Sequence, residues 1–388
     1  MTVISPSAQQ SEAIKSICAW YGKKQPQEFY LAGYAGTGKS TIANIAIEEI
    51  KEQFKIKRVL TAAYTGKAAS VLRRKGIKEA TTVHSLIYTP VVDEKTGQVH
   101  FELSDESPAA KAELIVLDEC SMVDEAMAND LRSFGKKILI MGDPGQLPPV
   151  NGAGAFTKRE PDVFLREVHR QAEGSPILEL ATLARLGKPL PTHFEQDKVK
   201  VVPLTKDTQP LVYADDTQVI CGINRVRWTY TQRIRNLRGF EGRRPAVGEK
   251  LICCRNNRIL GLFNGGMGTL QDFHSDYKGA QGAFEVDVKM EDDSEVKTGI
   301  EIDPFHFDNH FMNGDAARLP RQVGRTLDEF DWGYVITCHK AQGSSWEHVT
   351  IIDDSGSFRE NRNLWLYTAI TRAEQGLTLL TRTPNQWR

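Results

Sequence analysis

Residues 33–40 read GYAGTGKS and fit the phosphate-binding pattern G-x-x-x-x-G-K-[ST]. In such a loop the glycines let backbone amides close around phosphates. Lys39 offers a positive charge to the outer phosphates, and Ser40 offers an oxygen to Mg²⁺. An apolar strand at 28–33 precedes the loop and a helix is predicted from Ser40 to about Phe54, so the context favours a phosphate site over a chance glycine turn.

Residues 114–119, LIVLDE, form an apolar strand that ends in two carboxylates. Asp118 can hold a metal ion, and Glu119 can orient and deprotonate an attacking water. Taken alone, this pair is also compatible with a solvated loop. Together with the glycine-rich loop it predicts hydrolysis of a nucleoside triphosphate, a reaction that switches, kinases and motors share.

A third chemically suggestive loop, GDPGQLPPV at 142–150, follows the apolar strand KILIM. It places Gln146 on a segment stiffened by three prolines. A neutral amide at the end of a strand can contact both a γ-phosphate and a second ligand without adding charge. As an isolated string the same residues would be read as a turn.

These residues need parallel strands to bring them together. Strands rich in branched residues alternate with helices up to Val150, which predicts a parallel sheet covered on both faces. A second α/β unit is expected at 151–240 and 331–388, and it includes a long basic helix that begins at Asn224. Short alternating runs and glycine-rich turns at 241–330 predict a small inserted β domain.

Composition sets wider limits. A chain of 388 residues with 40% hydrophobic content can form two or three packed domains. Lys plus Arg (49) nearly balance Asp plus Glu (50), so any basic surface for nucleic acid must be local. The six cysteines lack metal-site spacing and are expected to be reduced core residues. No signal region and no apolar run of about 18 residues is found, so a cytoplasmic protein of a bacterium or an infecting phage is expected.

A predicted β-hairpin at 88–105 interrupts the first α/β unit. Two short alternating runs flank a polar turn that contains Gly97. Such an insertion, between the segments TTVHSL and LIVLDE, calls for a functional reason.

The ordered set GYAGTGKS, AAYTGKAA, TTVHSL, LDECSM, GDPGQLPPV, EVHRQ, ITCHKAQGSSWE and LYTAITRA resembles the successive motifs of superfamily 1 DNA helicases. The nearest likeness is to the 5′→3′ branch typified by the Dda and RecD helicases. The motifs extend from Gln10 to Arg372. The resemblance implies an α/β fold of two RecA-like P-loop domains with parallel sheets. It also implies a β-hairpin insertion in the first domain and a small SH3-like β-barrel insertion in the second.

The resemblance implies a role for each matching residue. Gln10 would bind adenine, Ser40 and Asp118 would hold Mg²⁺, and Gln146 would sense the γ-phosphate. Arg170 and Arg372 would stabilise charge on the same phosphate from the second α/β unit. The implied catalytic set is Lys39, Asp118, Glu119, Gln146, Arg170 and Arg372. The implied ATP contacts are Gln10, Gly33, Ala35, Gly36, Thr37, Gly38, Lys39, Ser40, Thr41 and Gly343.

A path for single-stranded DNA is implied in the same way. The expected contacts are Thr65, Gly66, Lys67, His84, Ser85, Phe101, Thr337, His339 and Lys340. The hairpin would act as a pin that separates duplex strands, with Phe101, Tyr88 and His100 as its candidate surfaces. Each of these residues taken alone could simply belong to a capped loop.

The basic helix is expected to be mainly a solvated face, with Arg227, Arg235 and Arg238 pointing away from its apolar stripe. Trp228 and Trp346 could stack on bases. Large aromatic side chains more often serve packing, so neither is included in the expected sites.

The function implied is an ATP-dependent DNA helicase that moves 5′→3′ on single-stranded DNA and uses ATP with Mg²⁺. Expected partners are single-stranded and fork DNA and replication or recombination proteins, with the chain as a monomer. Two alternatives remain: an RNA helicase or a translocase that does not unwind, and a P-loop switch or loader.

Overall fold

The computed structural model describes residues 6–92, 99–148, 154–167, 174–213, 217–257, 259–274, 283–312, 314 and 327–382. The chain divides into two compact units. The first comprises Met1–Tyr64 and Ala68–Thr182, and the second comprises Thr65–Lys67 and Leu183–Arg388. No helix in the described part of the chain is long and apolar enough to cross a membrane.

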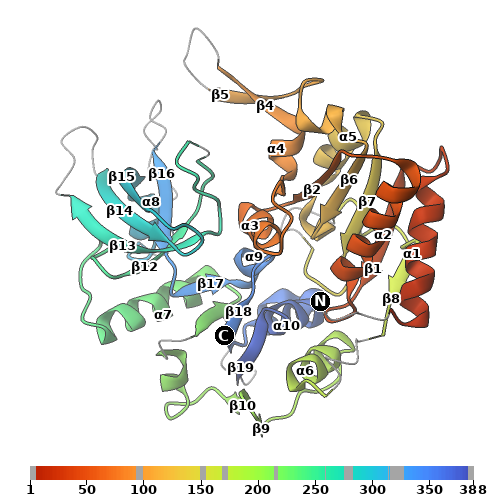
Figure 1. Cartoon of the computed structure of the whole chain (residues 1–388). Coiled ribbons are helices and arrows are strands. Elements are labelled where there is room, and N and C mark those ends of the chain that lie inside the picture. Colours follow the sequence, from red (N-terminus) through yellow and green to blue (C-terminus); the bar gives the residue numbers. More distant parts are fainter. Residues whose placement is uncertain are drawn as a thin grey trace. The chain divides into compact units, whose positions relative to one another are not determined.

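The first unit is built on a parallel sheet whose described strands follow the order β3-β2-β6-β7-β1-β8 (Figure 1). The strands are β1 (Glu28–Gly33), β2 (Val59–Ala63), β3 (Thr81–Thr82), β6 (Leu114–Asp118), β7 (Lys137–Gly142) and β8 (Val163–Leu165). The helices are α1 (Ala8–Tyr21), α2 (Lys39–Phe54), α3 (Gly66–Arg74), α4 (Val83–Ile87) and α5 (Glu125–Ser133).

Alternating side chains of the central strands supply both cores of this unit. On β6, Leu114 and Val116 pack with α1 and α2, whereas Ile115 and Leu117 pack with α4 and α5. All four side chains are at most 1% exposed. A strand covered on both faces needs an unbroken apolar sequence, and LIVL supplies it.

The predicted hairpin is confirmed. Strands β4 (Tyr88–Val92) and β5 (Val99–Leu103) pair antiparallel, with Tyr88 opposite Leu103. Its turn, residues 93–98 with Gly97, lies outside the described residues.

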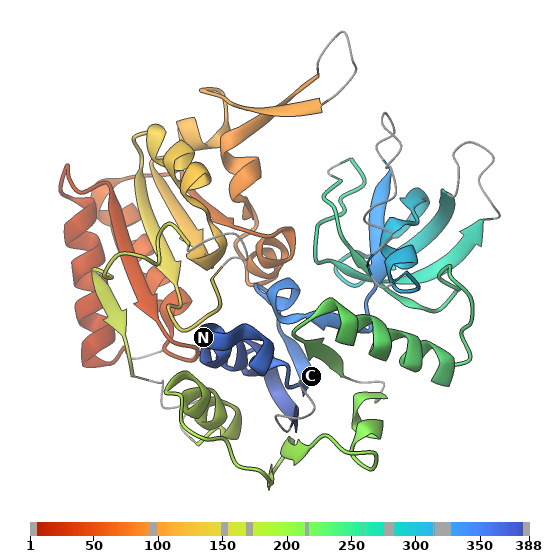
Figure 2. The ribbon, with the colours of Figure 1, turned by 180° about the vertical axis from the view of Figure 1, so that it is seen from behind.

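The second unit contains a sheet and a barrel (Figures 1 and 2). Its described sheet strands run β17-β11-β18-β19-β10-β9, with β9 antiparallel to β10 and the other pairs parallel. The sheet strands are β9 (Phe194–Gln196), β10 (Val199–Pro203), β11 (Gln218–Cys221), β17 (Val335–Thr337), β18 (Trp346–Ile352) and β19 (Ala373–Thr381). Its helices are α7 (Asn224–Leu237), α9 (Cys338–Ala341) and α10 (Arg362–Ile370), and α6 (Pro176–Arg185) begins in the first unit and ends in the second.

The expected β insertion is a closed barrel. Its strands are β12 (Lys250–Cys253), β13 (Met267–His274), β14 (Phe284–Met290), β15 (Val296–Asp303) and β16 (Asp328–Trp332), and the short helix α8 (Phe305–Asn309) lies between β15 and β16. The chain therefore has two RecA-like domains, a hairpin in the first and a barrel in the second.

One boundary differs from the expectation. The first unit continues to Thr182 rather than ending at Val150, because β8 pairs with β1 in the first sheet. A three-residue strand between loops carries too little periodicity to be assigned to a sheet from sequence.

Helix α7 corrects the expectation of a solvated basic face. Arg227 and Arg235 are 7% and 2% exposed, and each pairs with a fully buried carboxylate. Arg235 Nε donates to Glu249 Oε1 at 2.7 Å and its Nη2 donates to Glu249 Oε2 at 3.1 Å. Arg227 Nη1 donates to Asp331 Oδ2. Only Arg238 of the three is exposed as predicted. These pairs join α7 to the barrel.

We predict that Arg235→Met destabilises the second unit by about 3–5 kcal/mol, because it leaves Glu249 as a buried, unpaired charge. Urea unfolding followed by fluorescence should show a lower midpoint. Arg233→Met, an exposed position on the same helix, is the matched control and should change stability by less than about 0.5 kcal/mol. Equal effects of the two substitutions would contradict the structural role of Arg235.

Candidate functional site

The loop between β1 and α2 is shaped by two glycines. Gly36 and Gly38 have φ of 78° and 82°, values that favour glycine, and α2 begins at Lys39. Lys39 Nζ donates to the carbonyls of Gly33 and Tyr34 at 2.6 and 3.1 Å. The ammonium group is therefore held within the loop itself. Ala35 lies in the same loop, and Ser40 and Thr41 lie in the first turn of α2.

Gln10, the predicted adenine contact, lies against this loop. Its Nε2 donates to Thr37 O at 3.1 Å, and its Oε1 accepts from Ser7 N at 2.9 Å. The second bond belongs to a capping box at the start of α1, in which Ser7 Oγ accepts from Gln10 N. The side chain is 5% exposed. Its role toward adenine remains a prediction.

The paired carboxylates lie at the end of β6. Burial, followed by the charge of Glu119, raises the pKa of Asp118, while Lys39 acts in the opposite sense. Glu119 adopts φ 54° and ψ 50°, a left-handed conformation that is strained for a residue other than glycine. Such strain persists where surrounding structure enforces it, and it clusters at functional sites.

Gln146 follows β7, the strand between β1 and β6. It is 8% exposed, and within the described residues its Oε1 has no hydrogen-bond partner. Because β1, β7 and β6 are parallel neighbours, their carboxyl ends share one edge of the sheet. The glycine loop, Gln146 and the carboxylate pair therefore converge there, which is where ligands bind in open α/β sheets.

The groups at this edge fit a magnesium-bound nucleoside triphosphate. A Cβ on Gly33 would meet Thr37 Oγ1 at 2.6 Å, so the backbone there is closely cradled. A glycine-rich loop, an ammonium, a hydroxyl and a carboxylate are the donor set that phosphates and Mg²⁺ use. Ser40 and Asp118 would hold the ion.

In the second unit, Arg372 is 6% exposed and is held by oxygens of its own unit. Its Nε donates to Thr368 O and its Nη1 to Ser344 O, both at 3.1 Å. These bonds hold the guanidinium group in place. Both acceptors are uncharged carbonyl oxygens, so they do not neutralise its positive charge. Gly343, with φ 75°, follows α9. Arg170 lies outside the described residues.

Three predicted DNA contacts lie around α9. Thr337 caps this helix and accepts from Lys340 N at 3.4 Å. Lys340 Nζ lies 2.8 Å from Cys254 Sγ. The His339 ring lies 5.8 Å from that of Phe358.

Another group of predicted DNA contacts, Thr65 to Lys67, belongs to the second unit. Lys67 is 5% exposed and pairs with Asp292 at 2.7 Å. A Cβ on Gly66 would lie 2.4 Å from Phe263 Cβ, so this glycine is needed for close packing. Asp292, which lies between β14 and β15 of the barrel, thus supplies a counter-charge to Lys67.

The hairpin base carries an aromatic cluster. The His84 ring lies 4.8 Å from Tyr88 and 4.5 Å from Phe101, which is 47% exposed. Tyr88 OH donates to Asp130 at 2.5 Å, and Ser85 N donates to Thr82 Oγ1 at 3.1 Å. The side chain of His100 is outside the described residues. Phe101 is therefore the exposed ring among the described candidates.

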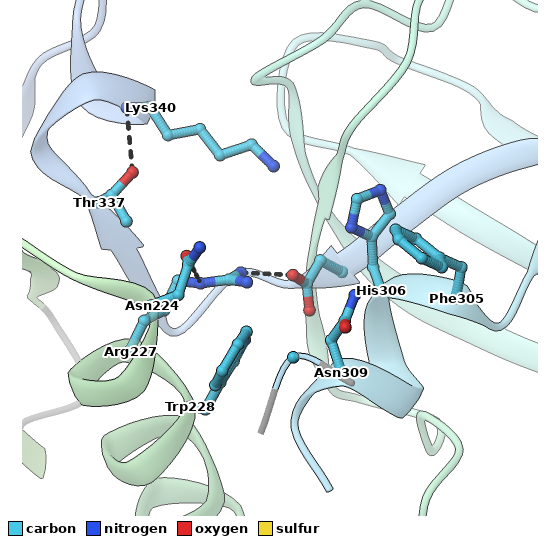
Figure 3. A pocket seen from close by; sticks show the side chains of 10 residues that line it. Asn224, Arg227, Trp228, Phe305, His306, Asn309, Thr337 and Lys340 are labelled. Carbon is cyan, nitrogen blue, oxygen red and sulfur yellow. Dashed lines mark hydrogen bonds and ion pairs between the residues drawn. The ribbon is translucent and has the colours of Figure 1, made fainter. Parts of the chain in front are cut away.

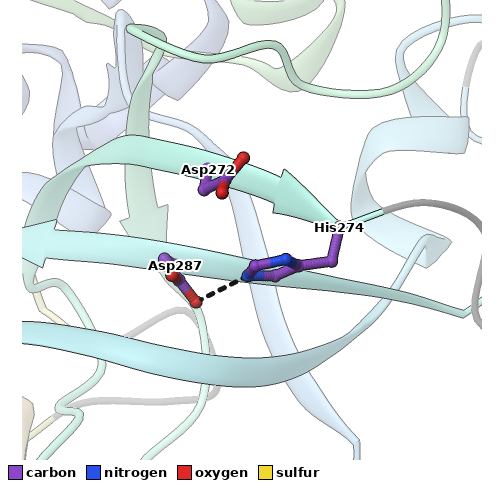
Figure 4. Close-up of side chains that lie close together, drawn as sticks. All are labelled: Asp272, His274 and Asp287. Carbon is purple, nitrogen blue, oxygen red and sulfur yellow. Dashed lines mark hydrogen bonds and ion pairs between the residues drawn. The ribbon is translucent and has the colours of Figure 1, made fainter.

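The barrel surface brings together Asp272, His274 and Asp287, which sequence analysis did not single out (Figure 4). Asp287 Oδ1 accepts from Gly299 N at 2.9 Å and lies 3.0 Å from His274 Nε2. The hydrogen bond to Asp287 raises the pKa of His274. These hydrogen bonds connect side chains at the barrel surface, and they explain why His274 and Asp287 lie together.

Two parts of the chain match known protein families. Residues 5–202 match the model of the AAA domain family, and residues 333–380 match the UvrD-like helicase C-terminal domain. The chain belongs to the AAA domain family. The two matches together place it among the superfamily 1 helicases that its motifs resemble.

Two relatives and one solved structure illustrate the similarity. The chain is 28% identical over 360 residues to the ATP-dependent RecD2 DNA helicase of Deinococcus radiodurans, covering 88% of this chain and 45% of that protein. It is 31% identical over 177 residues to the ATP-dependent DNA helicase dda of Enterobacteria phage T4, covering 43% and 39%. The chain thus spans less than half of either relative. The structure of Bacteroides Pif1 bound to ssDNA has a TM-score of 0.57 at 17% identity, covering 99% and 94%.

We predict that Gly38→Ala weakens ATP binding by about tenfold or more, because its φ is left-handed and the new Cβ would lie 2.9 Å from Gln10 Nε2. Titration with a fluorescent ATP analogue measures the loss. Gly76→Ala is the matched control, since Gly76 has φ 99° and its Cβ would meet nothing within 4 Å. It should alter stability but leave nucleotide affinity unchanged; equal loss in both variants would contradict a specific effect at the loop.

Proposed function

We propose that this chain is the motor of an ATP-dependent DNA helicase that moves 5′→3′ along single-stranded DNA. The observation that carries the proposal is the shared sheet edge at which the glycine loop, Gln146 and the Asp118–Glu119 pair converge. The order of motifs and the match of residues 333–380 to the UvrD-like helicase C-terminal domain support its extension from hydrolysis to movement on DNA.

The first unit would bind and hydrolyse ATP. Lys39 would exchange its bonds to loop carbonyls for bonds to phosphate oxygens. Glu119, held by its backbone conformation, would orient the attacking water and accept its proton. Bound Mg²⁺ would neutralise charge on the phosphate oxygens. Arg170 and Arg372 remain predicted charge-stabilising cations.

The strand contacts would make hydrolysis respond to DNA. Thr337 and Lys340 in the second unit and His84 and Ser85 in the first would contact the strand. Phe101 would present an exposed ring to the base pairs at a fork. The relatives of this chain that carry helicase names, and the Pif1 structure bound to single-stranded DNA, support this assignment.

Steady-state ATP hydrolysis tests the proposal directly. We expect weak hydrolysis without nucleic acid, stimulation of about tenfold or more by single-stranded DNA, and less by single-stranded RNA. Duplexes with a 5′ tail should be unwound and those with a 3′ tail should not. No stimulation by DNA would favour a switch or loader, equal stimulation by RNA would favour an RNA helicase, and unwinding from 3′ tails alone would overturn the polarity.

We further predict that Phe101→Ala lowers unwinding about fivefold or more while DNA-stimulated hydrolysis changes by less than twofold, because base-stacking is lost without altering the ATP site. Leu103→Ala, which removes another exposed apolar side chain from β5, is the matched control. Strand separation and hydrolysis are measured on the same fork. Parallel loss of both activities would mean that the ring supports the fold, and unchanged unwinding would remove it from the pin.

A further inference from the structure

The second unit contains a pocket of about 400 Å³ beside the predicted strand contacts (Figure 3). It lies between α7, α8, β16 and the start of α9. Its lining residues are Asn224, Arg227, Trp228, Phe305, His306, Asn309, Gly314, Asp331, Thr337 and Lys340. This volume falls within the range of about 300–1,000 Å³ for small-molecule sites.

Two buried polar atoms of the pocket have no hydrogen-bond partner within the described residues. Asn309 is 8% exposed, and within the described residues its buried Oδ1 has no hydrogen-bond partner. Trp228 Nε1 is likewise buried without an acceptor in the described part of the chain. In Figure 3 the two side chains lie on opposite sides of the same space. Because buried polar groups are normally paired, these groups point to a ligand with hydrogen-bonding edges.

The ionisable groups inside the pocket are compensated. Arg227 Nη1 bonds Asp331, whose other oxygen lies 2.7 Å from His310 Nε2. His306 Nε2 lies 2.9 Å from Glu329 Oε2. The interior therefore suits an uncharged ring better than a free ion. Two aromatic side chains, Trp228 on α7 and Phe305 on α8, also line the pocket.

The rim of the pocket, unlike its interior, carries a positive charge. Lys340 extends toward the pocket, and among the described residues its ammonium has a thiol but no carboxylate within bonding distance. Thr337 Oγ1 lies on the same side. A cationic rim next to an uncharged, aromatic interior matches a ligand in which an uncharged heteroaromatic ring is joined to a phosphate.

We propose that this pocket receives one nucleobase of the bound single strand. Trp228 forms a stacking wall, the Asn309 amide bonds the edge of the base, and Lys340 contacts the adjoining phosphate. Every base offers a hydrogen-bonding edge and a π-face, so the pocket would accept any sequence. The inference rests on the proposed function and adds a base contact to its phosphate contacts.

The test is an abasic scan with the full chain. Oligothymidylates that carry one abasic residue at successive positions are bound in the absence of nucleotide, and affinity is measured by fluorescence anisotropy. One position should weaken binding about fivefold or more in the unmodified protein, because a stacked base is lost. Trp228→Leu should bind the intact strand correspondingly more weakly and lose sensitivity to that position. Trp346→Leu, the same change on β18 away from the pocket, should retain it.

Asn309→Ala provides a second variant if Trp228→Leu does not fold. It should reduce the sensitivity at the same position and leave the salt dependence of binding unchanged, since it removes no phosphate contact. Lys340→Ala should lower the salt dependence instead. A flat scan in the unmodified protein, or undiminished sensitivity in Asn309→Ala, would overturn the base pocket. Failure of the unmodified protein to bind single-stranded DNA would instead overturn the proposed function.

Discussion

The second unit depends on the neutralisation of two carboxylates that are wholly buried. Glu249 and Asp331 are both 0% exposed, and a lone charge at either position would be strongly unfavourable. Helix α7 supplies an arginine to each. Arg227 and His310 outweigh the effect of burial and hold the pKa of Asp331 well below its usual range, whereas burial lowers the pKa of His310. The barrel is thereby fixed to α7, and the pocket beside them acquires its shape.

A different constraint organises the first unit. Parallel strands present their carboxyl ends at one edge, so three loops that are distant in sequence meet there. Local backbone geometry then sets the direction of each group. Glycines with positive φ shape the phosphate loop. Glu119 also has a positive φ, so its side chain leaves the backbone in a different direction from that of an extended strand residue.

The sequence predicted the local features well. The glycine loop, the carboxylate pair and the hairpin are each specified by neighbouring residues, and the structure has the loop, the strand end and the paired strands at those positions. The basic helix was misread because its partners are distant: Glu249 is 14 residues from Arg235, and Asp331 is 104 residues from Arg227. Helical periodicity separates polar from apolar faces, but it does not indicate whether a polar face meets water or buried carboxylates. Likewise, Trp228 could be identified as a stacking candidate from sequence, whereas the unpaired Oδ1 of Asn309 could be found only in the structure.

Lys39 Nζ donates two hydrogen bonds to carbonyls of the phosphate loop in which it lies. The two carbonyls compete with the phosphates of a nucleotide for this ammonium. The binding free energy of each nucleotide is reduced by the free energy needed to displace those bonds. The same bonds re-form when the phosphates leave, which favours product release. A nucleotide site built in this way would trade tight binding for easier release.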